Sequence, residues 1–217
     1  MKLTKYAHAC FTVEKNNQIL VVDPGNLSPD FHAPSSVTAI VITHEHADHF
    51  DSSILEEIIN TNPDAVVIAH PSLTEKMELL PTVSVLPGEK YNVGPFNLSF
   101  FGGEHALIHE SLPIIPNLGV LINDTVYYPG DSLVAPGTRP VEVLALPVAA
   151  PWLKVSETLD FLRAVKPRIA FATHDAILSS DGQQVVDRMV QAIATAQDTH
   201  YLRIDEPLTI NEKDLLT

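Results

Sequence analysis

The sequence contains little cysteine, few basic residues and no long apolar run. Its single cysteine, Cys10, excludes an internal disulfide. The segment 1–6 lacks the apolar centre of a secretion signal, and no run approaches the length needed to cross a membrane. These absences predict a cytoplasmic protein that has no membrane partner.

Positive charge is also scarce. There are 13 Lys and Arg residues against 27 Asp and Glu residues, which gives a net charge of −14. A long nucleic-acid footprint needs clustered basic side chains to replace counterions, so we expect a small-molecule substrate and not a nucleic acid. The remaining composition, 45% hydrophobic and 18% charged over 217 residues, is typical of a globular protein with a sizeable core. The oligomeric state is left open, with a homo-oligomer as one alternative.

The most informative stretch is 44–49, which has the pattern H-x-H-x-D-H. Three histidines and an aspartate fall within six positions, directly after the apolar run Ala39–Ile42. Imidazole and carboxylate groups are ligands that zinc and similar ions prefer. A histidine-rich surface turn is the alternative, but such a cluster seldom follows a strand that looks buried. The stretch therefore predicts a metal site at the end of a strand.

Three further metal-type ligands follow apolar runs later in the chain. His105 comes after Gly102 and Gly103, Asp131 after a Pro-Gly turn, and His174 after the run 169–173. If these strands lie side by side, their ends meet at one edge. The number of ligands suits two ions, with Asp131 bridging because a carboxylate has two oxygens to share. The expected ligands are His44, His46 and His105 for one ion, and Asp48, His49 and His174 for the other.

Other polar and aromatic residues are candidates for supporting roles. Asp23 ends an early strand and either holds the second nitrogen of a ligand histidine or belongs to an ordinary turn. His8 is expected to be a structural residue, with a pocket role as the alternative. His109 either lines the pocket or lies on the surface. Trp152 is expected to pack at the start of a helix, with a place at the mouth of the pocket as the alternative.

The order of predicted elements alternates strands and helices, as in a layered α/β fold. Ser53 and Glu56 match a capping box and predict a helix from that point, with Leu55 and Ile58 on its apolar face. From residue 118 the order restarts. We therefore predict one domain over 1–217, built as two pseudo-repeated halves of about 1–110 and 118–217.

The complete set resembles the metallo-β-lactamase superfamily in the order of its ligands, and it is most similar to small bacterial metal-dependent hydrolases related to ascorbate-6-phosphate lactonases. This resemblance implies a four-layer αββα sandwich of two mixed sheets flanked by helices. It also implies that Asp23 matches an aspartate of that family. Asp175 and Ala176 depart from the aromatic residue and glycine that often follow the last histidine in that branch. Asp175 is left as a pocket acid or as a support for the ligands.

The expected activity is metal-dependent hydrolysis by a hydroxide shared between two divalent ions. Zinc is expected, with manganese and iron as alternatives that the same ligands accept. Asp48 would hold the hydroxide and pass its proton to the leaving group. The expected substrate is a small-molecule ester, lactone, amide or phosphoester. The alternatives are a nucleic-acid phosphodiesterase, an iron-dependent redox enzyme or dioxygenase, and a metal-binding protein without turnover.

Overall fold

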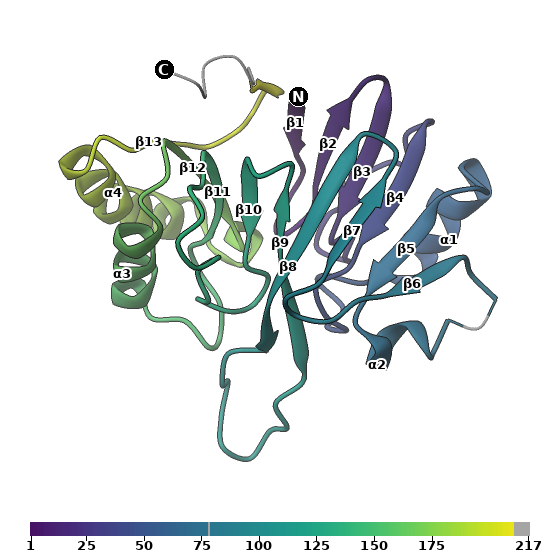
Figure 1. Ribbon diagram of the computed structural model, residues 1–217. Coiled ribbons are helices and arrows are strands. Elements are labelled where there is room, and N and C mark those ends of the chain that lie inside the picture. The colour runs from purple at the N-terminus through teal and green to yellow at the C-terminus, as the bar shows by residue number, and fades with distance from the viewer. Residues whose placement is uncertain (78, 211–217) are drawn as a thin grey trace.

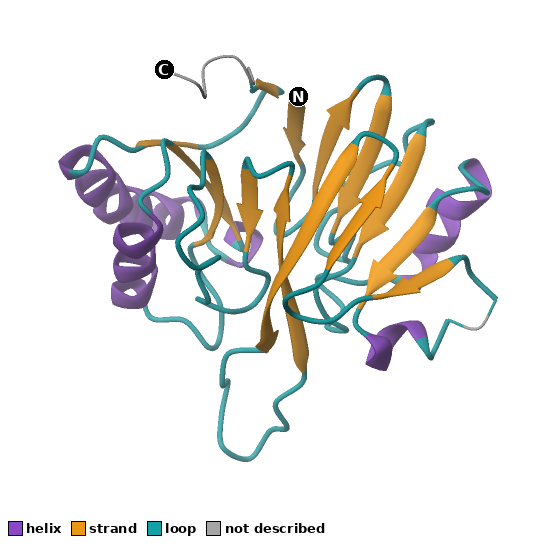
Figure 2. Cartoon of the chain, viewed as in Figure 1, coloured by secondary structure: helices purple, strands orange, loops and turns teal. Residues whose placement is uncertain are grey.

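The computed structural model describes residues 1–77 and 79–210, and it contains two seven-stranded sheets that pack face to face. Helices cover the outer faces of both sheets (Figure 1 and Figure 2). The chain thus forms the αββα sandwich that was predicted, and that prediction is confirmed.

The first sheet is built from the N-terminal third of the chain and one C-terminal strand. Its strands are β1 (Lys2–Lys5), β2 (Phe11–Lys15), β3 (Gln18–Val22), β4 (Val37–Val41), β5 (Val66–Ala69), β6 (Thr82–Ser84) and β14 (Leu208–Thr209). They lie in the order β14-β1-β2-β3-β4-β5-β6. Pairing is antiparallel from β14 to β3 and parallel from β3 to β6.

The second sheet repeats this change from antiparallel to parallel pairing. Its strands are β7 (Lys90–Val93), β8 (Phe96–Glu104), β9 (Pro116–Ile122), β10 (Val126–Tyr128), β11 (Val143–Pro147), β12 (Ile169–Thr173) and β13 (His200–Leu202). They lie in the order β13-β12-β11-β10-β9-β8-β7, antiparallel from β7 to β10 and parallel from β10 to β13. Strands β7 and β8 therefore belong to the second sheet, although they precede the predicted boundary near residue 110.

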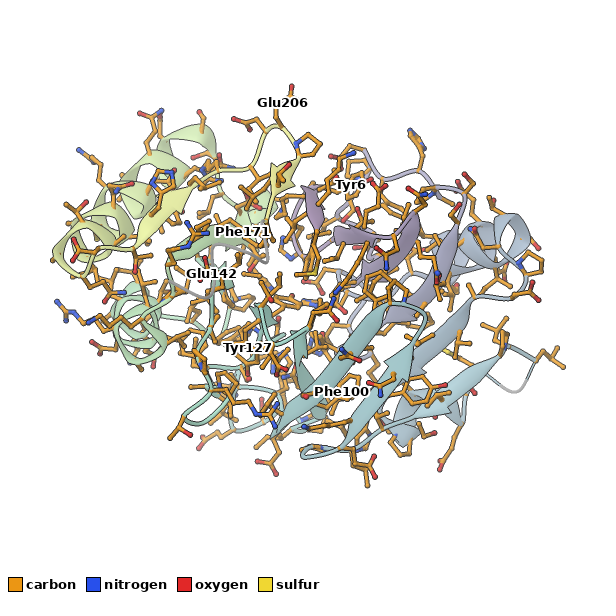
Figure 3. All side chains as sticks on the ribbon, turned by 45° about the horizontal axis from the view of Figure 1, so that its top comes forward. Tyr6, Phe100, Tyr127, Glu142, Phe171 and Glu206 are labelled. Carbon is orange, nitrogen blue, oxygen red and sulfur yellow. The ribbon has the colours of Figure 1, made fainter. Side chains whose placement is uncertain are left out.

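Three apolar layers hold the sandwich together. The central layer lies between the sheets and includes Phe11, Phe100 and Phe171. One outer layer lies where α1 (Ser52–Thr61) and α2 (Pro71–Thr74) cover the first sheet. The other lies where α3 (Val155–Val165) and α4 (Ser180–Ala196) cover the second, and it includes Tyr127 (Figure 3). Among the described residues no helix is long and apolar enough to span a membrane.

The N-cap of helix α1 lies two residues earlier than the sequence suggests. The N-cap is Asp51, whose carboxylate accepts hydrogen bonds from the backbone N–H groups of Ser53 and Ile54. The prediction of a cap at Ser53 was wrong because an aspartate two positions earlier satisfies the same free N–H groups. The predicted apolar face is correct, since Leu55 and Ile58 are buried.

The topology brings the ends of distant strands to one edge of the sandwich. Strands β4, β8 and β10 all run towards the lower edge in Figure 1. Strand β12 is parallel to β11 and β11 to β10, so β12 ends at that edge too. The residues that follow these strands include the seven expected ligands.

Candidate metal centre

The turn 44–49 follows β4 and is held tightly against the loop after β3. Inside the turn, the backbone N–H of His49 donates to the carbonyl of His46 at 3.0 Å. Gly25 passes directly beneath it, and a Cβ at that position would lie 1.9 Å from the carbonyl oxygen of Asp48. Only glycine permits this approach. The turn is therefore fixed by backbone contacts before any side chain is considered.

A first cluster consists of His44, His46, His105 and Asp131, whose ligand atoms all lie within 4.8 Å of one another. His44 Nε2 is 3.1 Å from His46 Nδ1, and His105 Nε2 is 3.2 Å from Asp131 Oδ2. Three separate segments, which follow β4, β8 and β10, supply these groups. This is the set expected for one ion, with Asp131 at its border.

A second cluster consists of His8, Asp48, His49 and His174, within the same 4.8 Å limit. Three of its members are those expected for the other ion, and His8 is an addition. His8 Nε2 lies 2.9 Å from Asp48 Oδ2, and its side chain is only 1% exposed. Of the two expectations for His8, the structure favours the pocket role over a merely structural one, because the loop between β1 and β2 carries it to the edge where β4 ends.

Asp131 stands between the two clusters and turns one oxygen towards each. Its Oδ1 lies 3.0 Å from His49 Nε2 and 2.8 Å from His174 Nε2. Its Oδ2 lies 3.2 Å from His105 Nε2 and 4.0 Å from His44 Nε2. A carboxylate placed in this way can serve two cations at once.

Residues behind the clusters orient the ligands. Asp23 is fully buried, and its Oδ2 lies 2.6 Å from His49 Nδ1, which leaves His49 Nε2 to face the site. The same oxygen accepts a 2.6 Å hydrogen bond from Thr43 Oγ1, which is also 3.1 Å from His44 Nδ1. Of the two readings of Asp23, the structure favours the supporting role over the ordinary turn.

Trp152 also contributes to the site, contrary to its predicted role in helix packing. Its indole N–H donates to Asp131 Oδ2 at 2.7 Å, and its ring centroid is 6.1 Å from that of His105. The sequence offers one signal for this position. Trp152 lies a few residues beyond the apolar run that forms β11, much as Asp131 follows β10 and His174 follows β12.

Electrostatics favour the cation-binding protonation states of His44 and of two carboxylates. At His49, by contrast, burial would lower the pKa, but the neighbouring Asp131 and Asp23 outweigh it and raise the pKa well above its ordinary value, so this ring must lose a proton before it can bind a cation. Burial lowers the pKa of His44 well below its ordinary value, so its ring is neutral and keeps a free lone pair. Burial would raise the pKa of Asp131, but the neighbouring His49 and His174 hold it well below its usual range. Burial would also raise the pKa of Asp48, but the hydrogen bond from His8 and the interaction with His49 outweigh it and lower this pKa to about 2. Both carboxylates are therefore anionic at neutral pH.

The clusters contain buried polar atoms that protein groups alone leave unsatisfied. Within the described residues, His49 Nε2, His174 Nε2 and Asp131 Oδ1 are buried and make no hydrogen bond of acceptable geometry, although the two nitrogens lie 3.0 Å and 2.8 Å from that oxygen. Such atoms cost about 1–3 kcal/mol each when nothing compensates them. Imidazole nitrogens and a carboxylate oxygen that converge in this way fit a divalent cation.

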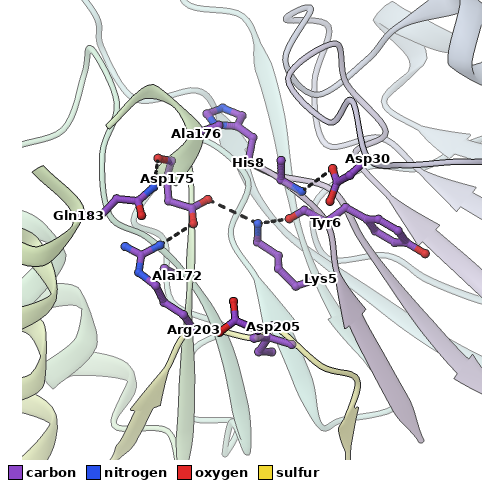
Figure 4. Close-up of a pocket in the computed structure, with 12 residues that line it drawn as sticks. Lys5, Tyr6, His8, Asp30, Ala172, Asp175, Ala176, Gln183, Arg203 and Asp205 are labelled. Atoms are coloured by element: carbon purple, nitrogen blue, oxygen red, sulfur yellow. Dashed lines mark hydrogen bonds and ion pairs between the residues drawn. The ribbon is translucent and has the colours of Figure 1, made fainter. Parts of the chain in front are cut away.

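The remaining candidates lie outside the two clusters. His109 is in the exposed β8–β9 loop, where its Nδ1 is 2.8 Å from Ser111 Oγ. Asp175 lines a neighbouring cavity of about 390 Å³ and pairs there with Arg203 at 2.6 Å and with Lys5 at 3.5 Å (Figure 4). Asp175 is thus a pocket acid, and His109 is a surface residue.

An αββα sandwich with two histidine- and aspartate-rich clusters at one edge defines a class, the metallo-β-lactamase-fold metal-dependent hydrolases. Residues 2–174 match the Beta-lactamase superfamily domain, so the chain belongs to that family.

The chain is also similar to individual proteins. Protein Rv0786c of Mycobacterium tuberculosis is 37% identical over 190 residues, which cover 85% of this chain and 89% of that protein. The UPF0173 metal-dependent hydrolase NEQ378 of Nanoarchaeum equitans is 23% identical, over 80% of this chain and 83% of that protein. The solved structure of Igni18, a metallo hydrolase from Ignicoccus hospitalis, superposes with a TM-score of 0.72 at 16% identity, covering 97% of this chain and 99% of that one. At that identity the likeness to Igni18 concerns the fold alone.

Proposed function

We propose that this protein hydrolyses a small-molecule ester, lactone, amide or phosphoester by means of two divalent ions, one at each cluster. The observation that carries the proposal is the position of Asp131, whose two oxygens face different clusters. Zinc is the proposed ion because the donors are imidazole nitrogens and carboxylate oxygens. Two ions at such a site lower the pKa of a shared water towards neutrality and polarise the bond to be cleaved.

The protein's own groups then have distinct roles. Asp48 is partly exposed, anionic and held by His8, so it can orient the attacking water and carry a proton to the leaving group. Asp131 and Asp23 keep the imidazoles in place. Ser132 is buried, and its hydroxyl donates to the carbonyl of Pro129 at 3.1 Å. The proposal therefore assigns no covalent role to Ser132.

A small substrate is favoured by the charge of the protein. With 13 basic residues against 27 acidic ones, the chain offers little to offset the phosphates of a nucleic acid. Near the site, Lys5 and Arg203 are already paired with Asp175. These observations support a small molecule over an oligonucleotide.

The test combines metal analysis of the purified protein with a screen of lactones, esters, amides, phosphoesters and oligonucleotides. We expect two zinc ions per chain, turnover of at least one small-molecule class, and loss of that turnover after chelation with recovery on adding Zn²⁺. His109→Ala is the matched control, because it removes an exposed histidine outside both clusters and should change nothing.

Three results would contradict the proposal. Turnover of oligonucleotides alone would indicate a nucleic-acid phosphodiesterase. Bound iron together with oxygen uptake would indicate a redox enzyme or dioxygenase. Two bound ions without turnover of any substrate class would indicate a metal-binding protein.

A further inference from the structure

His8 contacts two members of the second cluster by different atoms. Its ring Nε2 lies 2.9 Å from Asp48 Oδ2, and its backbone carbonyl accepts a 3.2 Å hydrogen bond from the N–H of His174. Asp48 follows β4 in the first sheet and His174 follows β12 in the second. One residue near the N-terminus thus joins ligands delivered by both sheets.

The loop that presents His8 is fixed by contacts of its own. Ser28 Oγ donates to the carbonyl of Ala7 at 2.9 Å, and Asp30 Oδ1 accepts from the N–H of Ala7 at 3.1 Å. The backbone at His8 is left-handed, with φ of 58°. Non-glycine residues adopt this conformation at a cost, and Asn tolerates it best. The position of the His8 ring is therefore imposed by the loop.

The surroundings of the two ring nitrogens of His8 distinguish a metal ligand from a residue that positions a ligand. A histidine that binds a metal through one nitrogen almost always donates the N–H of the other to an acceptor. His49 Nδ1 has Asp23, and His105 Nδ1 has the carbonyl of Ala106 at 2.5 Å. Among the described residues, His8 Nδ1 is buried without a hydrogen-bond partner. An unpaired lone pair fits that environment better than an unpaired N–H, which places the hydrogen of His8 on Nε2.

We infer that His8 is a positioning residue, which donates its Nε2–H to Asp48 and thereby holds that carboxylate in the second cluster without being a ligand itself. The inference rests on the proposed function, because it concerns the ion at the second cluster. It predicts that His8 governs how tightly that ion is bound, and that it does so through Asp48.

Three substitutions separate the side-chain donor from the backbone conformation. His8→Gln keeps an N–H donor at about the reach of Nε2 but suits a left-handed backbone poorly. His8→Asn suits that backbone, yet its amide reaches only as far as Nδ1. His8→Ala has no side-chain donor and also suits a left-handed backbone poorly. Circular dichroism and thermal unfolding of each variant report whether it is folded.

The measurement is titration of the metal-free full-length protein with Zn²⁺ in competition with a chromophoric chelator. We expect two ions in the wild type, and a second ion bound about 10–100-fold more weakly in His8→Ala and His8→Asn. We expect His8→Gln to recover most of this loss, and every variant to reach two ions at saturating Zn²⁺. In an Asp48→Asn background, His8→Ala should add little further loss.

Each contrary result has a defined meaning. Saturation of His8→Ala at one ion would make His8 a ligand and overturn the inference. Recovery by His8→Asn and not by His8→Gln would assign the effect to the backbone and also overturn it. Fewer than two ions in the wild type would contradict the proposed two-ion site, a result that is distinguishable because it requires no variant.

Discussion

The two clusters differ in where their support comes from. In the first, His44 is held by the adjacent Thr43, and His105 by the carbonyl of the adjacent Ala106. In the second, His49 depends on Asp23, which lies 26 positions away, and Asp48 depends on His8, 40 positions away. The direct supports of the first cluster thus come from sequence neighbours, although Thr43 is itself held by Asp23, whereas those of the second come from residues far away in the sequence. Substitutions should therefore affect the two clusters to different degrees.

Asp131→Ala should have the largest effect, because Asp131 belongs to the first cluster and its Oδ1 also contacts His49 and His174 of the second. We expect the fold to persist, at least one ion to be lost and nearly all activity to disappear, as measured by metal content and turnover. Asp124→Ala, which removes an aspartate whose side chain is 80% exposed, is the control. Two tightly bound ions in Asp131→Ala would refute its bridging position.

Asp48→Asn should come next, since it acts on the second cluster and on proton transfer. The amide is nearly the same size but cannot accept a proton, so we expect kcat to fall by about 10²–10⁴-fold. Steady-state kinetics at saturating Zn²⁺ separates this loss from weaker metal binding. An unchanged kcat would remove Asp48 from proton transfer.

Asp23→Asn should have a smaller effect, greatest at the second cluster, because Asp23 contacts His49 directly and His44 only through Thr43. The change weakens the contact with His49 Nδ1, so we expect the affinity for one ion to fall by about 10–100-fold. The affinity for the other ion should fall less in the same chelator titration, because Asp23 reaches His44 only through Thr43. Equal weakening of both ions would contradict the separation of the clusters.

The smallest effect concerns acid stability of the metal-free protein. Asp48 has a folded pKa of about 2 against an ordinary value of 3.8. A lowered folded pKa contributes stability that is fully present above the unfolded value and is lost as pH falls through the folded one. Acid unfolding followed by circular dichroism should therefore lose stability more steeply between about pH 4 and pH 2 in the wild type than in Asp48→Asn. Identical slopes would show that the contact with His8 does not stabilise the charged form.

The contrast between the clusters also explains what the sequence alone could predict. Each expected ligand follows a recognisable apolar strand, so local patterns were enough to propose that His44, His105, Asp131 and His174 converge. The αββα sandwich came from the resemblance of the complete ligand set, and the structure confirms it.

The expectations that the structure does not favour have two causes: the partner is distant in the sequence, or a nearby residue fits the same local rule equally well. His8 and Trp152 were assigned structural roles because their partners, Asp48 and Asp131, are brought to them only by the fold. The cap at Ser53 was wrong because Asp51 fits the same local rule. The position of β7 and β8 in the second sheet could not be predicted, since strand pairing leaves no mark on a single sequence.

The central claim is that Asp131 bridges two ions, and a crystal structure of the zinc-loaded protein with anomalous scattering tests it most directly. We predict two zinc peaks about 3.5–4 Å apart. One should lie about 2.0–2.2 Å from Asp131 Oδ1 and the other at the same distance from Oδ2. A single peak, or two peaks that both contact the same oxygen of Asp131, would contradict the account.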